Sequence, residues 1–232
     1  MTGYGQFCPV ALAAETLTRR WTPLLIRELL CGSTRFNEIH RGVPRMSPSL
    51  LSRRLDELQR AGIVERRAGD GHDHAEYHLT AAGEELRPVI LGLGEWGQRW
   101  FRGEWSEDEL DADLLMWDVH RQIDPARTPP GRTVVRFVFP DQPTESRSFW
   151  LVVDPGETDL CRKDPGYGVD LEIRADLRTM TKIWMGRAAF ARALKQGAVE
   201  LRGPAALQRS VSDWLGRSLF AEVPVPGDER GP

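Results

Sequence analysis

Residues 47–67, SPSLLSRRLDELQRAGIVERR, constrain the fold of this chain more than any other segment. Ser47 followed by Pro48 is typical of a helix start, because serine caps an N-terminus and proline fits the first turn. Leucines then recur at spacings of four and three, which predicts one buried face: Leu51, Leu55 and Leu58. Gly62 is expected to end the helix, and residues 63–67 to form a strand.

The flanking segments extend this helix-to-strand unit. We expect helices within 8–20, 21–32 and 33–44, and a strand at 76–80 that returns from 63–67. One long helix is expected over 81–101, with Pro88 and two glycines as places where it could bend. The order helix, helix, short helix, helix, hairpin is that of a winged helix-turn-helix. In the long helix, apolar residues recur on one side, where they could pack inward or against a partner: Leu86, Ile90, Leu93, Trp96 and Trp100.

Charge is distributed unevenly along the chain. The net charge is −3, but residues 1–67 hold 11 Arg against 6 Asp and Glu, a surplus of five, so the remainder carries −8. A locally basic N-terminal third is compatible with a nucleic-acid partner, which the overall acidic balance alone would not indicate. The 28 arginines run through both halves, which we interpret mainly as composition bias.

The expected helix at 47–62 has the surface that a major-groove helix needs. Opposite its leucines lie small serines and an arginine near the N-terminus, so the backbone could approach DNA closely. Arg53 could reach a guanine edge or a phosphate, and Arg54 is predicted to contact phosphate. The full set of candidate DNA contacts is Arg35, Ser47, Ser49, Ser52, Arg53, Arg54, Arg67, His72 and His74. The alternative is a solvated helix face with pairs such as Arg53–Glu57.

These motifs together give a specific resemblance. The segments RFNEI, SPSLLSRRLDELQRAGIVERR and YHLTAAG resemble the HxlR family of bacterial winged-helix regulators, over about residues 7–100. The resemblance implies a homodimer built on the first helix and the long helix after the wing. It also implies binding to double-stranded DNA at a pseudo-palindromic operator, with one recognition helix in each half-site.

Cys8 stands where several members of that family carry a redox-sensing cysteine in a CP pair. A sensing cysteine must be exposed and have a low pKa. The alternatives for Cys8 are therefore a thiol switch or a half-buried side chain without a role. A second cluster, His72 to His78 in the wing, is expected to be an ordinary polar turn, and we predict no metal site and no cofactor there.

The pattern changes after residue 131. We expect residues 1–102 to form the DNA-binding and dimerisation domain, 103–131 a helical linker, and 132–232 a second domain. Strands are predicted at 132–140, 146–154, 168–176 and 198–203, and helices at 177–186, 187–197 and 204–220. Strands followed by helices on one face give an α+β fold class for the chain.

Residues 130–220 resemble the sterol-carrier-protein type of lipid-binding domain, through VDLEIRADLRTMTKIWMG and AVELRG. That resemblance implies a ligand-binding sensor module with a tunnel for an apolar small molecule. From the pattern, the pocket candidates are Phe137, Phe139, Phe149, Leu151, Leu171, Ile173, Met180, Trp184 and Phe190. From composition alone, a filled core is the favoured interpretation of the same residues.

The remaining features of the sequence exclude several classes of protein. No catalytic motif stands in 132–232, so we expect no enzyme. Three widely spaced cysteines, no signal peptide and no membrane-length apolar run indicate a cytoplasmic protein. The expectation is thus a ligand-modulated DNA-binding regulator, with a redox regulator or a carrier of hydrophobic ligands as the alternatives.

Overall fold

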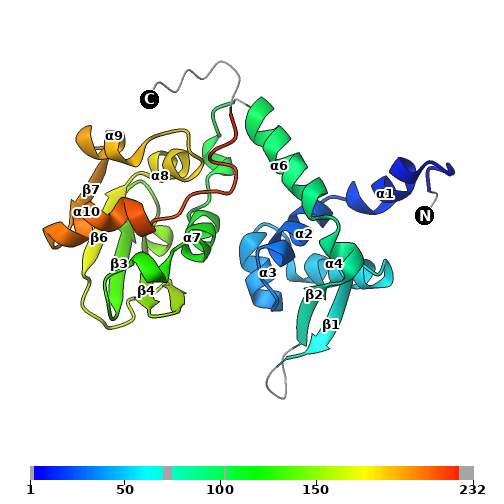
Figure 1. The fold of residues 1–232 in the computed structure, drawn as a ribbon, viewed down its shortest axis with the longest axis horizontal. Coiled ribbons are helices and arrows are strands. Elements are labelled where there is room, and N and C mark those ends of the chain that lie inside the picture. Colours follow the sequence, from blue (N-terminus) through cyan, green and yellow to red (C-terminus); the bar gives the residue numbers. More distant parts are fainter. Residues whose placement is uncertain (1–2, 70–74, 102, 225–232) are drawn as a thin grey trace. The chain divides into compact units, whose positions relative to one another are not determined.

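The computed structural model describes residues 3–69, 75–101 and 103–224. They form two compact units, Met1–Gly97 (unit 1) and Gln98–Pro232 (unit 2). Unit 1 is a helical domain with a two-stranded wing, and unit 2 carries a five-stranded sheet, so the chain is mixed α+β (Figure 1).

Unit 1 has the expected order of elements. They are α1 (Pro9–Leu17), α2 (Thr22–Leu30), α3 (Phe36–Gly42), α4 (Pro48–Arg60), β1 (Val64–Ala68), β2 (Ala75–Leu79), α5 (Ala81–Glu84) and α6 (Arg87–Trp100), the last turn of which falls in unit 2. β1 and β2 pair antiparallel, and Val64 lies opposite Leu79. An isolated bridge between Arg35 and Glu76 adds a short third segment to this wing.

The core of unit 1 lies where α2, α3 and α4 meet. Its buried members are Leu25, Leu29, Ile39, Val43, Met46, Leu51, Leu55, Leu58 and Val64. All three leucines predicted to face inward from α4 are in this cluster. Gly62 has a φ of +70°, which a residue with a side chain rarely adopts, so the predicted helix end is confirmed.

The segment 81–101 differs from its expectation of one long helix. It forms two helices, α5 and α6, with a turn at residues 85–86. Pro88 has no N–H to donate to the carbonyl of Glu84, so an α-helix cannot run through this point without losing a hydrogen bond. Proline is instead tolerated in the first turn of a new helix, which is where Pro88 stands in α6.

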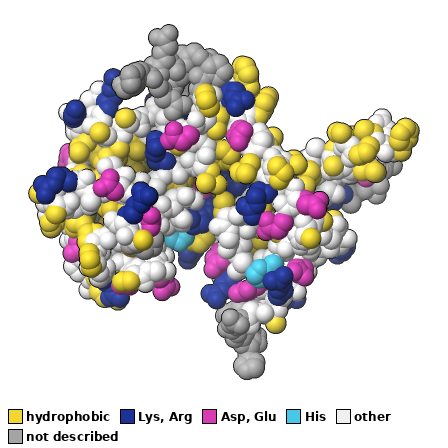
Figure 2. Space-filling model, in the orientation of Figure 1, with side chains coloured by type: hydrophobic (Ala, Val, Ile, Leu, Met, Phe, Trp, Pro, Cys, Tyr) yellow, Lys and Arg dark blue, Asp and Glu magenta, His cyan; other side chains and the backbone are white. Residues whose placement is uncertain are grey.

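Two helices of unit 1 leave their apolar side chains on the surface. None of the residues of α1 is buried, and Phe7, Val10 and Leu12 are exposed. On α6, Ile90 is buried, whereas Leu93 and Trp96 are about half exposed. Figure 2 shows hydrophobic side chains gathered over α1.

Unit 2 is built on one mixed sheet. Its elements are α7 (Ala112–Arg121), β3 (Thr133–Val138), β4 (Ser148–Asp154), β5 (Glu157–Cys161), β6 (Leu171–Ala175), α8 (Leu177–Trp184), α9 (Phe190–Lys195), β7 (Val199–Arg202) and α10 (Ala205–Trp214), with 3-10 turns at Glu107–Glu109, Pro125–Arg127 and Thr144–Ser146. The strand order is β5-β4-β3-β6-β7, and only β3 and β6 pair in parallel.

Register places one face of each strand in the core. Phe137 of β3 lies opposite Phe149 of β4 and Ile173 of β6, and all three are buried. Helices α7, α8 and α10 contribute to the same buried cluster. On the other face, Arg136 lies over the ring of Trp150 and 3.6 Å from Glu172. The alternation therefore places the core cluster on one face, while the other face carries Arg136 and Glu172 beside buried valines such as Val134 and Val152.

Two features of unit 2 differ from the expectation. β5 was not predicted, because its sequence ETDLC is mostly polar and short; it forms as the return strand of a hairpin with β4. The closing helix ends at Trp214 rather than at residue 220. Beyond it, Gly216 lies so close to the carbonyl of Gln122 that a Cβ would stand 2.2 Å from its oxygen.

Candidate nucleic-acid interface

Helix α4 has the cap and the buried face that its sequence predicts. Ser47 is the N-cap, and its Oγ accepts a hydrogen bond from the backbone N–H of Leu50 at 3.3 Å. Pro48 occupies the first turn. The leucine face is fully buried, which fixes the rotation of the helix about its own axis. The opposite surface of α4 is therefore the one that faces away from unit 1's core.

That opposite surface carries the predicted contact residues. Ser47, Ser49, Ser52 and Arg53 are all exposed, and Asp56 follows one turn later. Two small serines flank a single guanidinium near the N-terminal half, so a duplex could approach the helix backbone closely while Arg53 reaches a base edge or a phosphate.

Arg54 has a different environment from Arg53. Its side chain is only 13% exposed, and its Nη1 forms an ion pair with Glu57. Glu57 also accepts from Nη1 of Arg19 at 3.2 Å, across 38 residues of sequence. The alternative of a solvated helix face would pair Glu57 with Arg53, but Glu57 pairs with Arg54 and Arg19. Glu57 thus ties α4 to the segment after α1 through Arg19, and a phosphate contact by Arg54 would compete with its own pair to Glu57.

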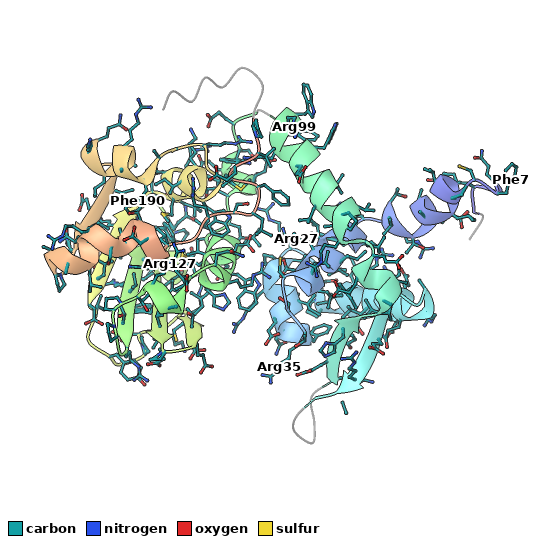
Figure 3. All side chains as sticks on the ribbon, in the orientation of Figure 1. Phe7, Arg27, Arg35, Arg99, Arg127 and Phe190 are labelled. Atoms are coloured by element: carbon teal, nitrogen blue, oxygen red, sulfur yellow. The ribbon has the colours of Figure 1, made fainter. Side chains whose placement is uncertain are left out.

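A buried carboxylate holds α2 against α3. Glu28 is fully buried; it accepts from Nε and Nη2 of Arg27 at 3.1 and 2.5 Å and from Ser33 Oγ at 3.4 Å. Nη2 of Arg27 also donates to the carbonyl of Gly42 at 3.0 Å. Gly42 has to be glycine, because a Cβ there would stand 1.9 Å from Glu28. Figure 3 labels Arg27 within unit 1.

Sequence reasoning missed this network. Its one signal is an acidic residue inside the apolar run LLIRELL, where an unpaired charge would be costly. A second missed contact fixes the turn between α3 and α4: His40 Nε2 lies 2.8 Å from the carbonyl oxygen of Met46. The network positions α2 against α3, and the His40 contact positions α3 relative to α4.

The wing joins the other helices through backbone and hydroxyl contacts. The N–H of Tyr77 donates to the carbonyl of Thr34 at 2.8 Å. Thr80 Oγ1 donates to the carbonyl of Gly62 at 2.6 Å and caps α5 by accepting from Gly83. A Cβ on Gly83 would lie 2.3 Å from the carbonyl oxygen of Ile63, which explains why LTAAG needs its glycine.

The remaining wing candidates divide into two groups. Arg67 is exposed on β1, and its Nη2 pairs with Glu65. Arg35 is 58% exposed, with its Nε 3.8 Å from Glu76. His72 and His74 lie outside the described residues. Among the residues that the structure describes, no three metal-ligating side chains cluster.

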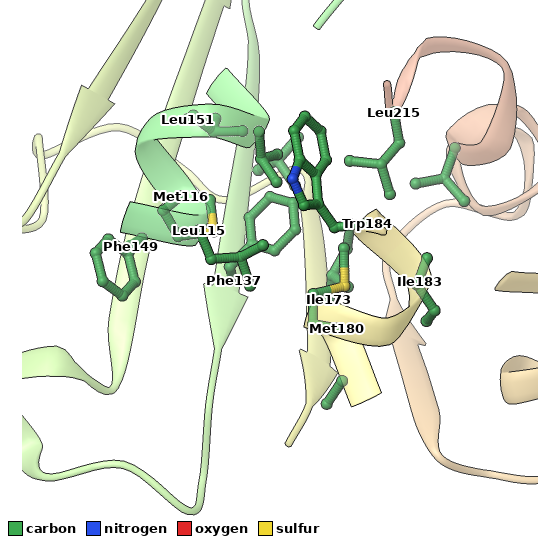
Figure 4. Close-up of a cluster of buried hydrophobic side chains, with 14 of the residues drawn as sticks. Leu115, Met116, Phe137, Phe149, Leu151, Ile173, Met180, Ile183, Trp184 and Leu215 are labelled. Carbon is green, nitrogen blue, oxygen red and sulfur yellow. The ribbon is translucent and has the colours of Figure 1, made fainter. Parts of the chain in front are cut away.

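The candidate pocket residues of unit 2 lie together in one buried cluster, part of which is drawn in Figure 4. Eight of the nine are buried in the unit 2 core: Phe137, Phe139, Phe149, Leu151, Leu171, Ile173, Met180 and Trp184. Phe190 is partly buried against them. The structure brings the set together, as both a filled core and a ligand pocket require.

Cys8 lies at the other end of the chain and is exposed, as the N-cap of α1. Across the described parts of the chain, no helix has the length and apolar character needed to cross a membrane.

Comparison with known proteins bears on unit 1. A model of the HxlR-like helix-turn-helix family matches residues 16–104. The regulator YvaP of Bacillus subtilis, an uncharacterized HTH-type transcriptional regulator, is 36% identical over 97 residues, 41% of this chain and 90% of its own length. A regulator of the same description from Synechocystis, sll1512, is 32% identical over 107 residues, 46% of this chain and 79% of its own length.

A solved structure is also similar. The reduced form of the transcriptional regulator YodB from B. subtilis has 32% identity and a TM-score of 0.37, and it covers 42% of this chain and 97% of its own. The relatives are named as transcriptional regulators, a function that is not enzymatic. With its winged helix-turn-helix and its identity to these regulators, the chain belongs to the HxlR-like helix-turn-helix family of transcriptional regulators.

Proposed function

We propose that this regulator binds a pseudo-palindromic DNA operator as a homodimer, with α4 of each copy in the major groove. The observation that carries the proposal is the exposed surface of α4, where Ser49, Ser52 and Arg53 stand opposite a fully buried leucine face. The other contacts in the proposal are Arg35 and Arg67 to phosphates, together with His72 and His74, which lie between β1 and β2 in sequence. Arg54 is also proposed to contact a phosphate, and it would give up its ion pair with Glu57 to do so.

The test of the DNA proposal starts from operator fragments selected out of genomic DNA by the full chain. On the selected duplex, Arg53→Ala is expected to cost about 1–3 kcal/mol of binding free energy, measured by fluorescence anisotropy. Arg60→Ala is the matched control, since Arg60 is exposed in the last turn of the same helix. Wild-type affinity is expected to fall steeply with salt. Equal losses for both variants would refute a specific role for Arg53.

The dimer proposal is supported by the exposed apolar side chains of α1 and α6. A helix without a single buried residue, such as α1, gains little from packing on its own unit and much from packing on a second copy. Leu93→Glu is expected to shift the chain to a monomer in analytical ultracentrifugation, whereas Val169→Glu, at an exposed apolar site of unit 2, is expected to leave it a dimer. Retention of the dimer by Leu93→Glu would contradict the use of this face.

We also propose that unit 2, as a sterol-carrier-like domain, binds an apolar molecule that modulates DNA affinity. Besides its apolar core, one detail supports this: Trp214 is 1% exposed, and its Nε1 has no hydrogen-bond partner within the described residues. A buried donor without an acceptor is costly, and a ligand carbonyl or carboxylate would supply one. Palmitate is a suitable probe, and Trp214→Phe is expected to weaken its binding about tenfold while retaining the fold. The same affinity in Trp214→Phe would refute a role for this donor.

A thiol switch at Cys8 is the second candidate regulation. Its support is that the thiol is exposed at the start of α1, within the face assigned to the dimer. Oxidant is then expected to change the DNA affinity of the wild type and to have no effect on Cys8→Ser. Equal responses of the two proteins would remove this candidate.

A further inference from the structure

A hollow of about 580 Å³ opens between α3 and β2 in unit 1. Its walls carry two guanidinium groups, two aromatic rings, one carboxylate and one amide: Arg35, Arg41, Phe36, Tyr77, Glu38 and Asn37. The volume falls in the range of small-molecule sites, which is about 300–1,000 Å³. Figure 3 labels Arg35 at this side of unit 1.

The walls of the hollow are held by backbone hydrogen bonds. The carbonyl of Thr34 accepts from the N–H of Tyr77 at 2.8 Å, which fixes the start of α3 beside the wing. Glu38 Oε2 accepts from the N–H groups of Thr34 and Arg35 at 3.1 and 3.0 Å. The one carboxylate of the lining is therefore engaged in closing the first turn of α3. A shape supported in this way exists before a ligand arrives.

The charge of the lining favours an anion. The lining holds two guanidinium groups and one carboxylate, and that carboxylate already accepts two backbone N–H groups. The nearest carboxylate oxygen to Arg35 outside the lining, on Glu76, is 3.8 Å from its Nε, beyond hydrogen-bond distance. The planar donors of Arg35 can therefore turn to a closer acceptor, and a carboxylate accepts them as a bidentate pair.

The two aromatic rings of the lining indicate which kind of anion the hollow would bind. Phe36 and Tyr77 are half-buried, each with part of its surface open to the hollow. A DNA phosphate would use the guanidinium groups but not the rings, whereas a flat ligand would stack on them. We propose that this hollow binds a small planar aromatic carboxylate, with its acid group at Arg35 and Arg41 and its ring against Phe36 and Tyr77.

Binding at this place would act on DNA recognition through the elements that line it. α3 directly precedes α4, and β2 is a strand of the wing, so a molecule in the hollow contacts two parts of the DNA-binding unit. This consequence rests on the proposed function; the binding step itself does not. The site is therefore tested without DNA.

The experiment titrates the full chain with 2-naphthoate and with its uncharged counterpart 2-naphthamide, by isothermal calorimetry. The acid is expected to bind saturably and the amide at least about tenfold more weakly, because a charge-assisted pair is lost. Arg35→Gln combined with Arg41→Gln is expected to weaken naphthoate at least about tenfold, and Arg60→Gln to leave it unchanged. Asn37→Trp, which fills the hollow and removes no charge, is expected to abolish binding.

Three results would overturn the proposal: no saturable binding of naphthoate, equal binding of acid and amide, or equal binding to the wild type and the Arg35/Arg41 double variant. If that double variant loses DNA affinity while no acid binds, the hollow is a DNA contact and the ligand proposal is wrong. If the acid binds as expected and the chain selects no operator, the site stands and the proposed DNA function fails.

Discussion

Unit 1 and unit 2 each enclose a core, but they stabilise it by different means. The buried cluster of unit 1 has nine apolar members, and that of unit 2 has twenty-three. Unit 1 supplements its small core with a buried ion pair at Glu28 and leaves apolar side chains of α1 and α6 on its surface. Unit 2 packs aromatic side chains from a sheet against four helices, α7, α8, α9 and α10. The smaller core depends more on specific polar contacts, while the larger one depends on burial itself.

The largest effect should come from the core of unit 2. Phe137 is fully buried between Phe149 and Ile173 in register, so Phe137→Ala is expected to destabilise unit 2 by about 3–5 kcal/mol. Because the two cores share no residue, calorimetry should show a lower transition for unit 2 and an unchanged one for unit 1. Leu55→Ala should do the reverse. Transitions that move together in either variant would show that the units unfold as one.

The next effect tests the polar network of unit 1. Arg27→Ala leaves the fully buried carboxylate of Glu28 without its cation. Breaking a fully buried pair costs about 3–5 kcal/mol; since Arg27 is partly exposed, we expect about 2–3 kcal/mol from denaturant unfolding. Arg60→Ala, at an exposed site on α4, is expected to change the free energy of unfolding by less than about 0.5 kcal/mol. A similarly small loss in Arg27→Ala would mean that the core of unit 1 does not need this pair.

A third effect concerns the close approach of two backbones in unit 1. In Gly83→Ala the added Cβ would lie 2.3 Å from the carbonyl oxygen of Ile63, and the chain must shift to accept it. The expected cost is about 1–3 kcal/mol, as for other overpacked sites. Gly92→Ala is the matched control, because Gly92 lies in a helix with open space around its Cα. It should raise stability by about 0.5–1 kcal/mol, and a loss there would contradict the steric explanation for Gly83.

Local features of both units were predictable from sequence because they depend on neighbours along the chain. The cap at Ser47, the leucine face of α4 and the glycine turn at Gly62 all involve spacings of four residues or fewer. The strands β3, β4, β6 and β7 also follow their alternation. The strand that the sequence did not predict is β5. Its short polar segment forms a strand because it pairs with β4.

Contacts across sequence were not predictable, and they shape the candidate site. Spacing suggested a pair between Glu57 and Arg53, whereas in the structure Glu57 pairs with Arg54 and, across 38 residues of sequence, with Arg19. The approach of Gly42 to Glu28 and the hollow between α3 and β2 both depend on how helices pack. The residues that could read DNA were therefore visible in the sequence, while those that position them were not.

The smallest effect concerns the charged contacts that fasten the start of unit 2 to α8. Arg178 donates to the carbonyl of Trp105 at 2.6 Å and pairs with Glu107, while Lys182 pairs with Glu104 at 3.1 Å. The hydrogen bond and the charge of Lys182, together with Arg178, lower the pKa of Glu104 below its ordinary value of 4.5. These groups are exposed, so solvent screens their contribution to stability.

Protonation of Glu104 should therefore weaken unit 2 slightly in acid. A carboxylate whose pKa is lower in the folded chain contributes stability fully above its unfolded pKa of 4.5 and loses it as the pH falls through the lower folded pKa. Glu104→Gln is expected to lower the melting temperature of unit 2 by a degree or less near pH 7 and to flatten its decline below pH 4.5. Asp108→Gln, at a neighbouring exposed acid, serves as the control. An unchanged acid slope in Glu104→Gln would show that Glu104 does not contribute and that the fastening to α8 relies on the contacts of Arg178 with Trp105 and Glu107.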